Sequence, residues 1–449
     1  MLRWLKNSFK VHEKGEYFPL IIKVALAINL FNGLYFFRSP FDFYYGYLAY
    51  LILFPIFLVR YGIPKHFGII SGILLVTALF HIYIGNNTLG SFLKVFIGLF
   101  AAYLFFYYIV FKSGVKLILL FKFYLAGSLF CAGFGLLQMI GHILGLPPGS
   151  GPLWLFGFLT AYEGRTFGIR VSAFFGEPTY YAMFLSGAAF IAVHDLIFQS
   201  KKFFFNRFSA LILLVGVYFS YSSTFLAALG ISALLLALNY GFIRYALFLI
   251  PISLIGLNQL IQTSDEFGSR IEGVSNLFSD APQQEFNVFN YHGSAVILYN
   301  HFFVAKENFI RNPLFGTGIG SHPVAYEKYS LTKNIKVLGF NLNTKDANSM
   351  FNRLMSETGL FGLGIFFMLI LFGYVNRKTN DQLWIISNAC LVIMLINLGR
   401  QGHYFLAGFP FYVWMYYAVW KAKKTDNNKP ISSLPYKSPN SQTESTAVV

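Results

Sequence analysis

Long apolar stretches separated by short polar connections dominate the pattern of this sequence. Each stretch holds about 20 residues, the length that an α-helix needs to cross the hydrocarbon core of a bilayer. The pattern therefore predicts an all-α polytopic membrane protein with about twelve transmembrane helices. Their expected bounds are about 20–37, 41–59, 67–84, 91–111, 117–144, 173–198, 208–222, 224–240, 245–262, 357–375, 383–399 and 405–420.

These stretches predict one transmembrane domain at 20–424, preceded by a cytoplasmic segment at 1–19 and followed by a disordered cytoplasmic tail at 425–449. The longest polar interval, 263–355, is expected to be one large extracytoplasmic loop. No small-residue cleavage site follows the first apolar stretch, so no removable signal peptide is expected.

Composition agrees with this organisation, because 56% of the residues are hydrophobic and only 12% are charged. The net charge of +16 would suit a nucleic-acid-binding protein, but the cations sort by predicted side of the membrane, as the positive-inside rule demands. We therefore expect no nucleic-acid partner. The cations on the cytoplasmic side are Arg60, Lys65, Lys112, Lys116, Lys201, Lys202, Arg207, Arg244, Arg377, Lys378, Lys421, Lys423 and Lys424. The short outer connections hold Arg38, Arg165, Arg170 and Arg400.

One outer connection, at about 145–172, brings two arginines to the membrane edge, Arg165 and Arg170. Glu177 and Pro178 follow at the start of the next apolar stretch. A structural interpretation is that Arg170 pairs with Glu177 and that Pro178 opens a helix at its first turn. A functional interpretation is that the guanidinium groups bind phosphate, for which their fixed fork of donors is suited. Lys94 could join such a cationic site from the outer end of its helix.

The predicted loop contains a stretch with apolar residues at helical spacing, GSAVILYNHFFVAKENFIRNP, which predicts an amphipathic helix that ends before Pro313. The glycines of the following NPLFGTGIGSH allow close backbone approach. The loop ends with polar residues near the membrane surface, and the last short outer connection, LGRQGHYF, adds two more. These residues are Asp346, Asn348, Arg353, Glu357, Arg400 and His403.

Motifs of soluble enzymes are absent from the sequence, including HExxH, GxSxG, the Walker loop, CxxC and DxD. We therefore expect an outer-face site that uses no metal and no cofactor.

Three segments around the predicted loop resemble the O-antigen polymerase and O-antigen ligase superfamily of bacterial envelope glycosyltransferases. They are NPLFGTGIGS at 312–321, NSMFNRLMSETGLFGLGIFF at 348–367, and Arg170 with the following FFGEPTYYAMF. The ligase branch usually has a histidine beside the asparagine that precedes its E-x-G-L segment, but this chain has Asp346, Ala347 and Asn348 there. This departure favours the polymerase branch.

The resemblance implies a multi-pass protein of the bacterial inner membrane that joins glycans carried on undecaprenyl pyrophosphate at the periplasmic face. Membrane lipids surround such an enzyme, and a polysaccharide chain-length regulator is a further implied partner. Two alternatives stay open: an O-antigen ligase that transfers glycan to lipid A core, and a flippase or transporter of lipid-linked glycan.

Arginines meet the need for positive charge where pyrophosphate leaves. The candidates for catalysis are Arg170, Arg400, Glu177, Asp346 and His403. The candidates for binding pyrophosphate or glycan are Arg165, Arg270, Arg311, Arg353, His322 and Asn348. The general base could be Glu177, Asp346, His322 or His403, and the sequence does not choose among them.

Overall fold

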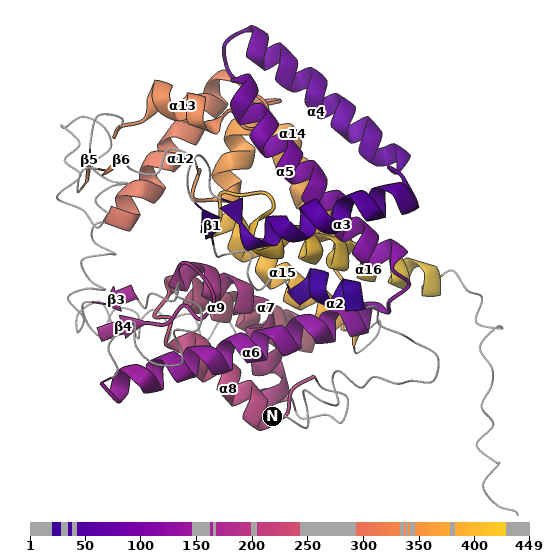
Figure 1. Cartoon of the computed structure of the whole chain (residues 1–449), viewed down its shortest axis with the longest axis vertical. Coiled ribbons are helices and arrows are strands. Elements are labelled where there is room, and N and C mark those ends of the chain that lie inside the picture. The colour runs from indigo at the N-terminus through magenta and orange to yellow at the C-terminus, as the bar shows by residue number, and fades with distance from the viewer. Residues whose placement is uncertain are drawn as a thin grey trace, which may run out of the picture.

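Helices make up most of the computed structural model, and the strands among the described residues form three two-stranded antiparallel hairpins (Figure 1). The structure describes residues 20–27, 35–37, 43–145, 162–164, 168–198, 204–242, 293–332, 336–337, 340–341, 346–377 and 382–427. The helices are α2 (Leu20–Ala27), α3 (Tyr45–Tyr61), α4 (Lys65–Tyr83), α5 (Leu89–Tyr107), η2 (Tyr108–Lys112), α6 (Leu117–Ile143), α7 (Pro178–Ile197), α8 (Arg207–Tyr218), α9 (Ser223–Tyr240), α12 (Gly293–Arg311), α13 (His322–Tyr329), α14 (Met350–Gly373), α15 (Leu383–Arg400), η5 (Leu406–Gly408) and α16 (Phe409–Asn427). The strands are β1 (Tyr35–Phe37), β2 (Phe43–Tyr44), β3 (Tyr162–Gly164), β4 (Gly168–Arg170), β5 (Lys336–Val337) and β6 (Phe340–Asn341).

Seven of the described helices are long and apolar enough to cross a membrane: α4, α5 with η2, α6, α7, α9, α14 and α15. Two more, α3 and α8, are apolar but shorter. The described part is therefore an α-helical membrane protein by length and composition. The predicted helix at 245–262, the first part of the predicted loop at 263–292, and the chain ends at 1–19 and 428–449 lie outside the described residues.

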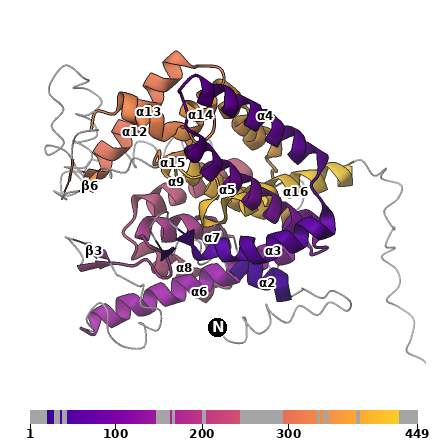
Figure 2. The same ribbon diagram turned by 45° about the horizontal axis from the view of Figure 1, so that its top comes forward.

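The centre of the bundle is formed by α7 and α15, which pack against each other and are each 78% buried over the span that could cross a membrane. Around them, α8 and α9 pack on α7, and α16 packs on α15. By contrast, α4 is only 17% buried and lies on the outside of the bundle in both views (Figures 1 and 2). Most of its surface would therefore face lipid.

Several helix bounds differ from the sequence prediction by a few residues. The first predicted helix, 20–37, is wrong at its end, because residues 35–37 form β1 and pair with β2. Aromatic residues such as these three favour an extended backbone. The helix predicted at 357 begins earlier, at Met350, because the Ser349 hydroxyl accepts the Asn352 backbone N–H at 3.3 Å and caps it. The helix predicted at 173–198 begins later, at Pro178, and this proline occupies the first turn of α7, as its structural interpretation expected.

The predicted amphipathic helix is confirmed as α12, which packs with α13 against the start of α14 (Figure 1). Val296 and Val304 are buried on its inner face, whereas Ile310 and Arg311 are exposed at its end. This helix and the two that it contacts build one side of the functional site.

A break interrupts α14 at Gly359, which has φ 60° and ψ −152°. The segment after α12 fills the break with backbone hydrogen bonds: Leu360 N–H donates to Pro313 O at 2.8 Å, and Gly318 N–H donates to Glu357 O at 2.9 Å. A Cβ on Gly316 would overlap the Glu357 backbone, so only glycine permits this approach. The break fixes this segment and the first turns of α14 to each other.

Candidate functional site

The candidate site lies at one end of the bundle, which we call the site end. At this end α5 and α14 begin, and α4 and α15 end. The central side chain of the site is Arg353, which is 2% exposed. Arg353 Nε donates to Glu357 Oε1 at 3.0 Å, one helical turn further along α14, and Nη1 donates to Gly402 O at 2.6 Å. Among the described residues no acceptor for a hydrogen bond from Nη2 is found. The Nε and Nη1 atoms of the Arg353 guanidinium are thus held by hydrogen bonds, and Nη2 is left as a donor for a ligand.

The Glu357 carboxylate is completely buried and accepts three hydrogen bonds. Besides Arg353, its donors are the Tyr404 hydroxyl at 2.9 Å and the His322 backbone N–H at 3.3 Å. Burial, and then the Glu357 charge, raise the pKa of Tyr404 well above its usual 10, so the phenol keeps the proton that it donates. Because its oxygens are engaged in this way, we interpret Glu357 as the group that orients Arg353 rather than as a base.

Two histidines from the predicted loop reach this network. His301 Nδ1 and His322 Nε2 are 3.0 Å apart, and both side chains are buried. Burial, followed by His301 and Arg353, lowers the pKa of His322 well below its ordinary 6.5. His322 is therefore neutral at pH 7 and bonds to His301 without adding a charge.

The turn before α14 and the turn after α15 meet beside Arg353. Asp346 Oδ1 accepts the Asn348 backbone N–H at 3.2 Å, and Asp346 Oδ2 lies 3.7 Å from His403 Nε2. A Cβ on Gly402 would overlap Asp346 Oδ1, so the carboxylate packs directly on this glycine. This contact holds the Gly402 carbonyl oxygen at the position where it accepts the hydrogen bond from Arg353 Nη1.

A cavity of about 650 Å³ opens beside these groups, between α3, α5 and the turn at 401–405. Among the described residues on its lining, three side chains can carry positive charge: Lys94, Arg353 and His403. The remaining wall is largely apolar and aromatic, with Tyr47, Tyr50, Leu51, Ile97 and Phe405 among its members. We call this space the cationic cavity. Positively charged groups beside an apolar wall suit a ligand with an anionic group joined to an apolar chain.

No family model matches the chain, and no curated protein matches it. The interpretation of the site therefore rests on its own geometry. Within the described residues there is also no group of three or more His, Cys, Asp and Glu side chains that could hold a metal ion.

The structure brings together five of the residues singled out in the sequence: Asp346, Asn348, Arg353, His322 and His403. All lie around the first turns of α14.

Two other predicted residues lie at the edge of this group. Arg400 ends α15 within electrostatic reach of Asp346 and of Glu177, which precedes the first turn of α7 and is exposed. Glu177 and Arg400 thus influence each other electrostatically at the ends of two helices that pack together, α7 and α15.

The other predicted arginines are not brought to the cationic cavity. Arg170 ends β4 and donates from Nε to Ser220 O at 3.1 Å, beside the turn between α8 and α9. Arg311 is exposed at the end of α12, where it pairs with Glu307 at 2.8 Å. Arg165 and Arg270 lie outside the described residues.

Sequence reasoning missed Tyr404 and His301 and did not assign Glu357 a role. Tyr404 follows His403 directly in the sequence, so its place in a charged outer connection was a usable signal. His301 sits among aromatic residues in an amphipathic helix, and its pattern is indistinguishable from packing. Only the fold reveals that it contacts His322.

Proposed function

We propose that this protein is a polymerase of lipid-linked oligosaccharide repeat units, a metal-independent glycosyltransferase that builds O-antigen or a related surface polysaccharide. The observation that carries the proposal is the cationic cavity, in which a buried guanidinium with a spare donor edge lies next to an apolar wall. A polyprenyl pyrophosphate has the matching chemistry, with a dianionic head on a long hydrocarbon chain. The resemblance of the segments at 312–321 and 348–367 to the O-antigen superfamily supports the same substrate class.

The proposed reaction is attack by an acceptor sugar hydroxyl on the anomeric carbon of the donor glycan. A new carbon–oxygen bond forms, the bond from the anomeric carbon to pyrophosphate breaks, and the pyrophosphate leaves with that electron pair. Arg353 and Lys94 would stabilise the charge that develops on the leaving group. The acceptor proton would pass to His403, which lines the cavity and lies 3.7 Å from the Asp346 carboxylate, whose charge would stabilise the protonated ring.

The polymerase is preferred to the ligase because the turn before α14 carries Asp346, Ala347 and Asn348 where the ligase branch usually has a histidine. In the proposed arrangement, about twelve helices span the bacterial inner membrane and both termini are cytoplasmic. The stretch 263–355 would then be periplasmic, and the site end would face the periplasm. A transporter would instead place ionisable residues at mid-membrane, whereas Arg353 and Glu357 lie in the first turns of α14.

The proposal is tested by glycan length in a strain that lacks the gene and carries variants of Arg353. Arg353→Lys keeps the charge but loses the fork of donors, and we expect short glycans, with chain extension reduced roughly 10-fold to 100-fold. Arg60→Gln is the matched control, because Arg60 is an exposed arginine in the last turn of α3. It should give polymer of normal length.

Removing Arg353 alone would leave the Glu357 charge buried, which costs roughly 3–5 kcal/mol and could prevent folding. The double variant Arg353→Met with Glu357→Met removes both charges together and is expected to fold. If this variant reaches normal membrane abundance and still makes long polymer, the proposed role of Arg353 is wrong. Single repeat units on the surface of the strain without the gene would identify a polymerase. Complete loss of attached glycan would indicate a ligase, and loss of export would indicate a flippase.

A further inference from the structure

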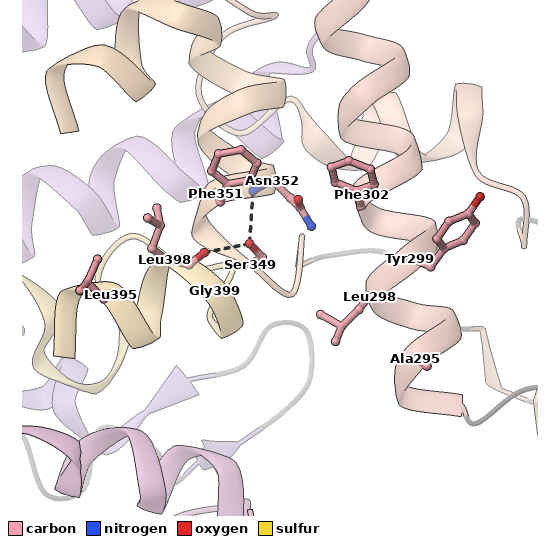
Figure 3. A pocket seen from close by; sticks show the side chains of 10 residues that line it. All are labelled: Ala295, Leu298, Tyr299, Phe302, Ser349, Phe351, Asn352, Leu395, Leu398 and Gly399. Atoms are coloured by element: carbon pink, nitrogen blue, oxygen red, sulfur yellow. Dashed lines mark hydrogen bonds between the residues drawn. The ribbon is translucent and has the colours of Figure 1, made fainter. Parts of the chain in front are cut away.

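A second cavity lies on another side of the same helix turn. It has a volume of about 480 Å³ and is lined by α12, the start of α14 and the end of α15 (Figure 3). We call it the neutral cavity, because none of the ten described residues that line it is charged. An anionic headgroup would find no counter-charge on this lining.

The neutral cavity contains one polar side chain without an evident partner. Asn352 is only 5% exposed, and its backbone N–H bonds to Ser349. Its side-chain amide makes no hydrogen bond to any described residue, and Figure 3 shows it extending from α14 toward α12. A buried amide normally has hydrogen-bond partners, so one that lines a cavity without them indicates a polar ligand.

Aromatic rings flank this amide. Figure 3 shows Phe351 from α14 on one side of Asn352 and Phe302 from α12 on the other. Aromatic faces pack against the C–H faces of a sugar ring, while one amide can both donate to and accept from neighbouring hydroxyl groups. An uncharged sugar matches both features, whereas a hydrocarbon chain would leave the amide unsatisfied.

We propose that the neutral cavity binds an uncharged sugar residue of the acceptor glycan; this rests on the proposed function. Asn352 and Arg353 are consecutive in α14, and each lines a different cavity. The first turns of α14 therefore separate a site for a neutral ring from a site for an anionic leaving group. The acceptor hydroxyl and the donor's anomeric carbon would meet where these two sites adjoin.

The test uses the purified full-length protein in lipid nanodiscs and two probes. One is the repeat-unit oligosaccharide released from its lipid carrier, which lacks pyrophosphate; the other is undecaprenyl pyrophosphate, which lacks sugar. We expect Asn352→Leu to weaken binding of the oligosaccharide about tenfold and to leave binding of undecaprenyl pyrophosphate unchanged. Phe302→Leu keeps an apolar side chain but removes the ring, and it should also weaken oligosaccharide binding. Asn312→Leu, at a half-buried asparagine that directly follows α12 and does not line the neutral cavity, is the matched control and should bind both probes normally.

Each other result has a definite meaning. Unchanged oligosaccharide binding by a folded Asn352→Leu variant would overturn the proposed sugar site. Weakened binding of undecaprenyl pyrophosphate alone would assign the cavity to a hydrocarbon chain, which also overturns it. If the wild type binds undecaprenyl pyrophosphate but not the oligosaccharide, the sugar site fails and the proposed function stands. If it binds neither probe, both fail.

Discussion

The opposite charges of Arg353 and Glu357 lower the free-energy cost of burying each side chain. A buried charge without a partner is strongly destabilising, and here the guanidinium and the carboxylate are 3.0 Å apart with further hydrogen bonds on both sides. Such a pair contributes little net stability compared with apolar residues, but it fixes one orientation of the arginine. Under the proposed function, this fixed orientation would serve ligand recognition more than stability.

His322 predicts a pH dependence of stability. Its folded-state pKa lies well below 6.5 because of burial, His301 and Arg353, whereas in the unfolded chain it would titrate near its ordinary value. The unfolded state therefore binds more protons below about pH 6.5, and this stability is present above that pH and lost as the pH falls toward the folded pKa. Thermal unfolding in detergent at pH 7.5 and pH 5 should show a smaller acid-induced loss for His322→Gln than for the wild type. Equal losses in the two proteins would contradict the prediction.

Single residues were predictable from the sequence where charge stood out against an apolar background. Arg353, Asp346 and His403 were conspicuous near the membrane edge, and the structure places them together. Asn352 was not conspicuous, because an uncharged amide in a polar stretch carries no signal until its burial is known. Arg170 looked equivalent to Arg353 in the sequence, and only packing separates their positions.

At the scale of elements, the broken helix α14 is the most informative. Hydropathy placed its start at 357, because residues such as Asn352 and Arg353 do not look like part of a membrane helix. They are helical in the structure because protein rather than lipid surrounds them. Strong apolar periodicity therefore predicted the helix, and a buried polar site displaced its apparent beginning by about two turns.

The break at Gly359 predicts that Gly359→Ala destabilises the protein by roughly 1–3 kcal/mol or more, because the required backbone conformation is strained for a residue with a side chain. In addition, the new Cβ would lie 2.5 Å from Pro313 O. Gly364→Ala is the matched control in the same helix, since no atom lies within 4 Å of its added Cβ. Thermal unfolding should show a large loss for Gly359→Ala and almost none for Gly364→Ala. Similar midpoints for the two variants would contradict the role of the break.

For the whole molecule, the asymmetry of the cations predicts orientation in the membrane. Glu327 on α13 and Arg207 at the start of α8 are both exposed, and the proposed topology puts them on opposite sides. A membrane-impermeant thiol reagent added to intact cells should label Glu327→Cys but label Arg207→Cys only after permeabilisation. The native Cys131 and Cys390 are buried and give little background. The reverse pattern of labelling would overturn the topology.

The sequence predicted the all-α membrane class and most of the described helices, because membrane spans are long and uniformly apolar. It could not predict which helices lie at the centre. α4 and α15 have the same mean hydropathy of 1.7, yet 17% of one and 78% of the other is buried. In lipid, an apolar side chain is equally suited to a protein neighbour and to a hydrocarbon chain, so hydropathy does not distinguish them.

The spacing of Arg353 and Glu357 also bears on how the chain is assembled. The two residues are four apart on one helix, so α14 carries its own counter-ion when it leaves the translocon. An isolated arginine near the end of a span is costly to transfer into lipid, and a neutral pair on the same helix lowers that cost. The helix can thus be inserted before α13 and Tyr404 are in place. The hydrogen bonds that the His322 backbone of α13 and the Tyr404 hydroxyl donate to Glu357 would then stabilise a charge pair that is already inserted.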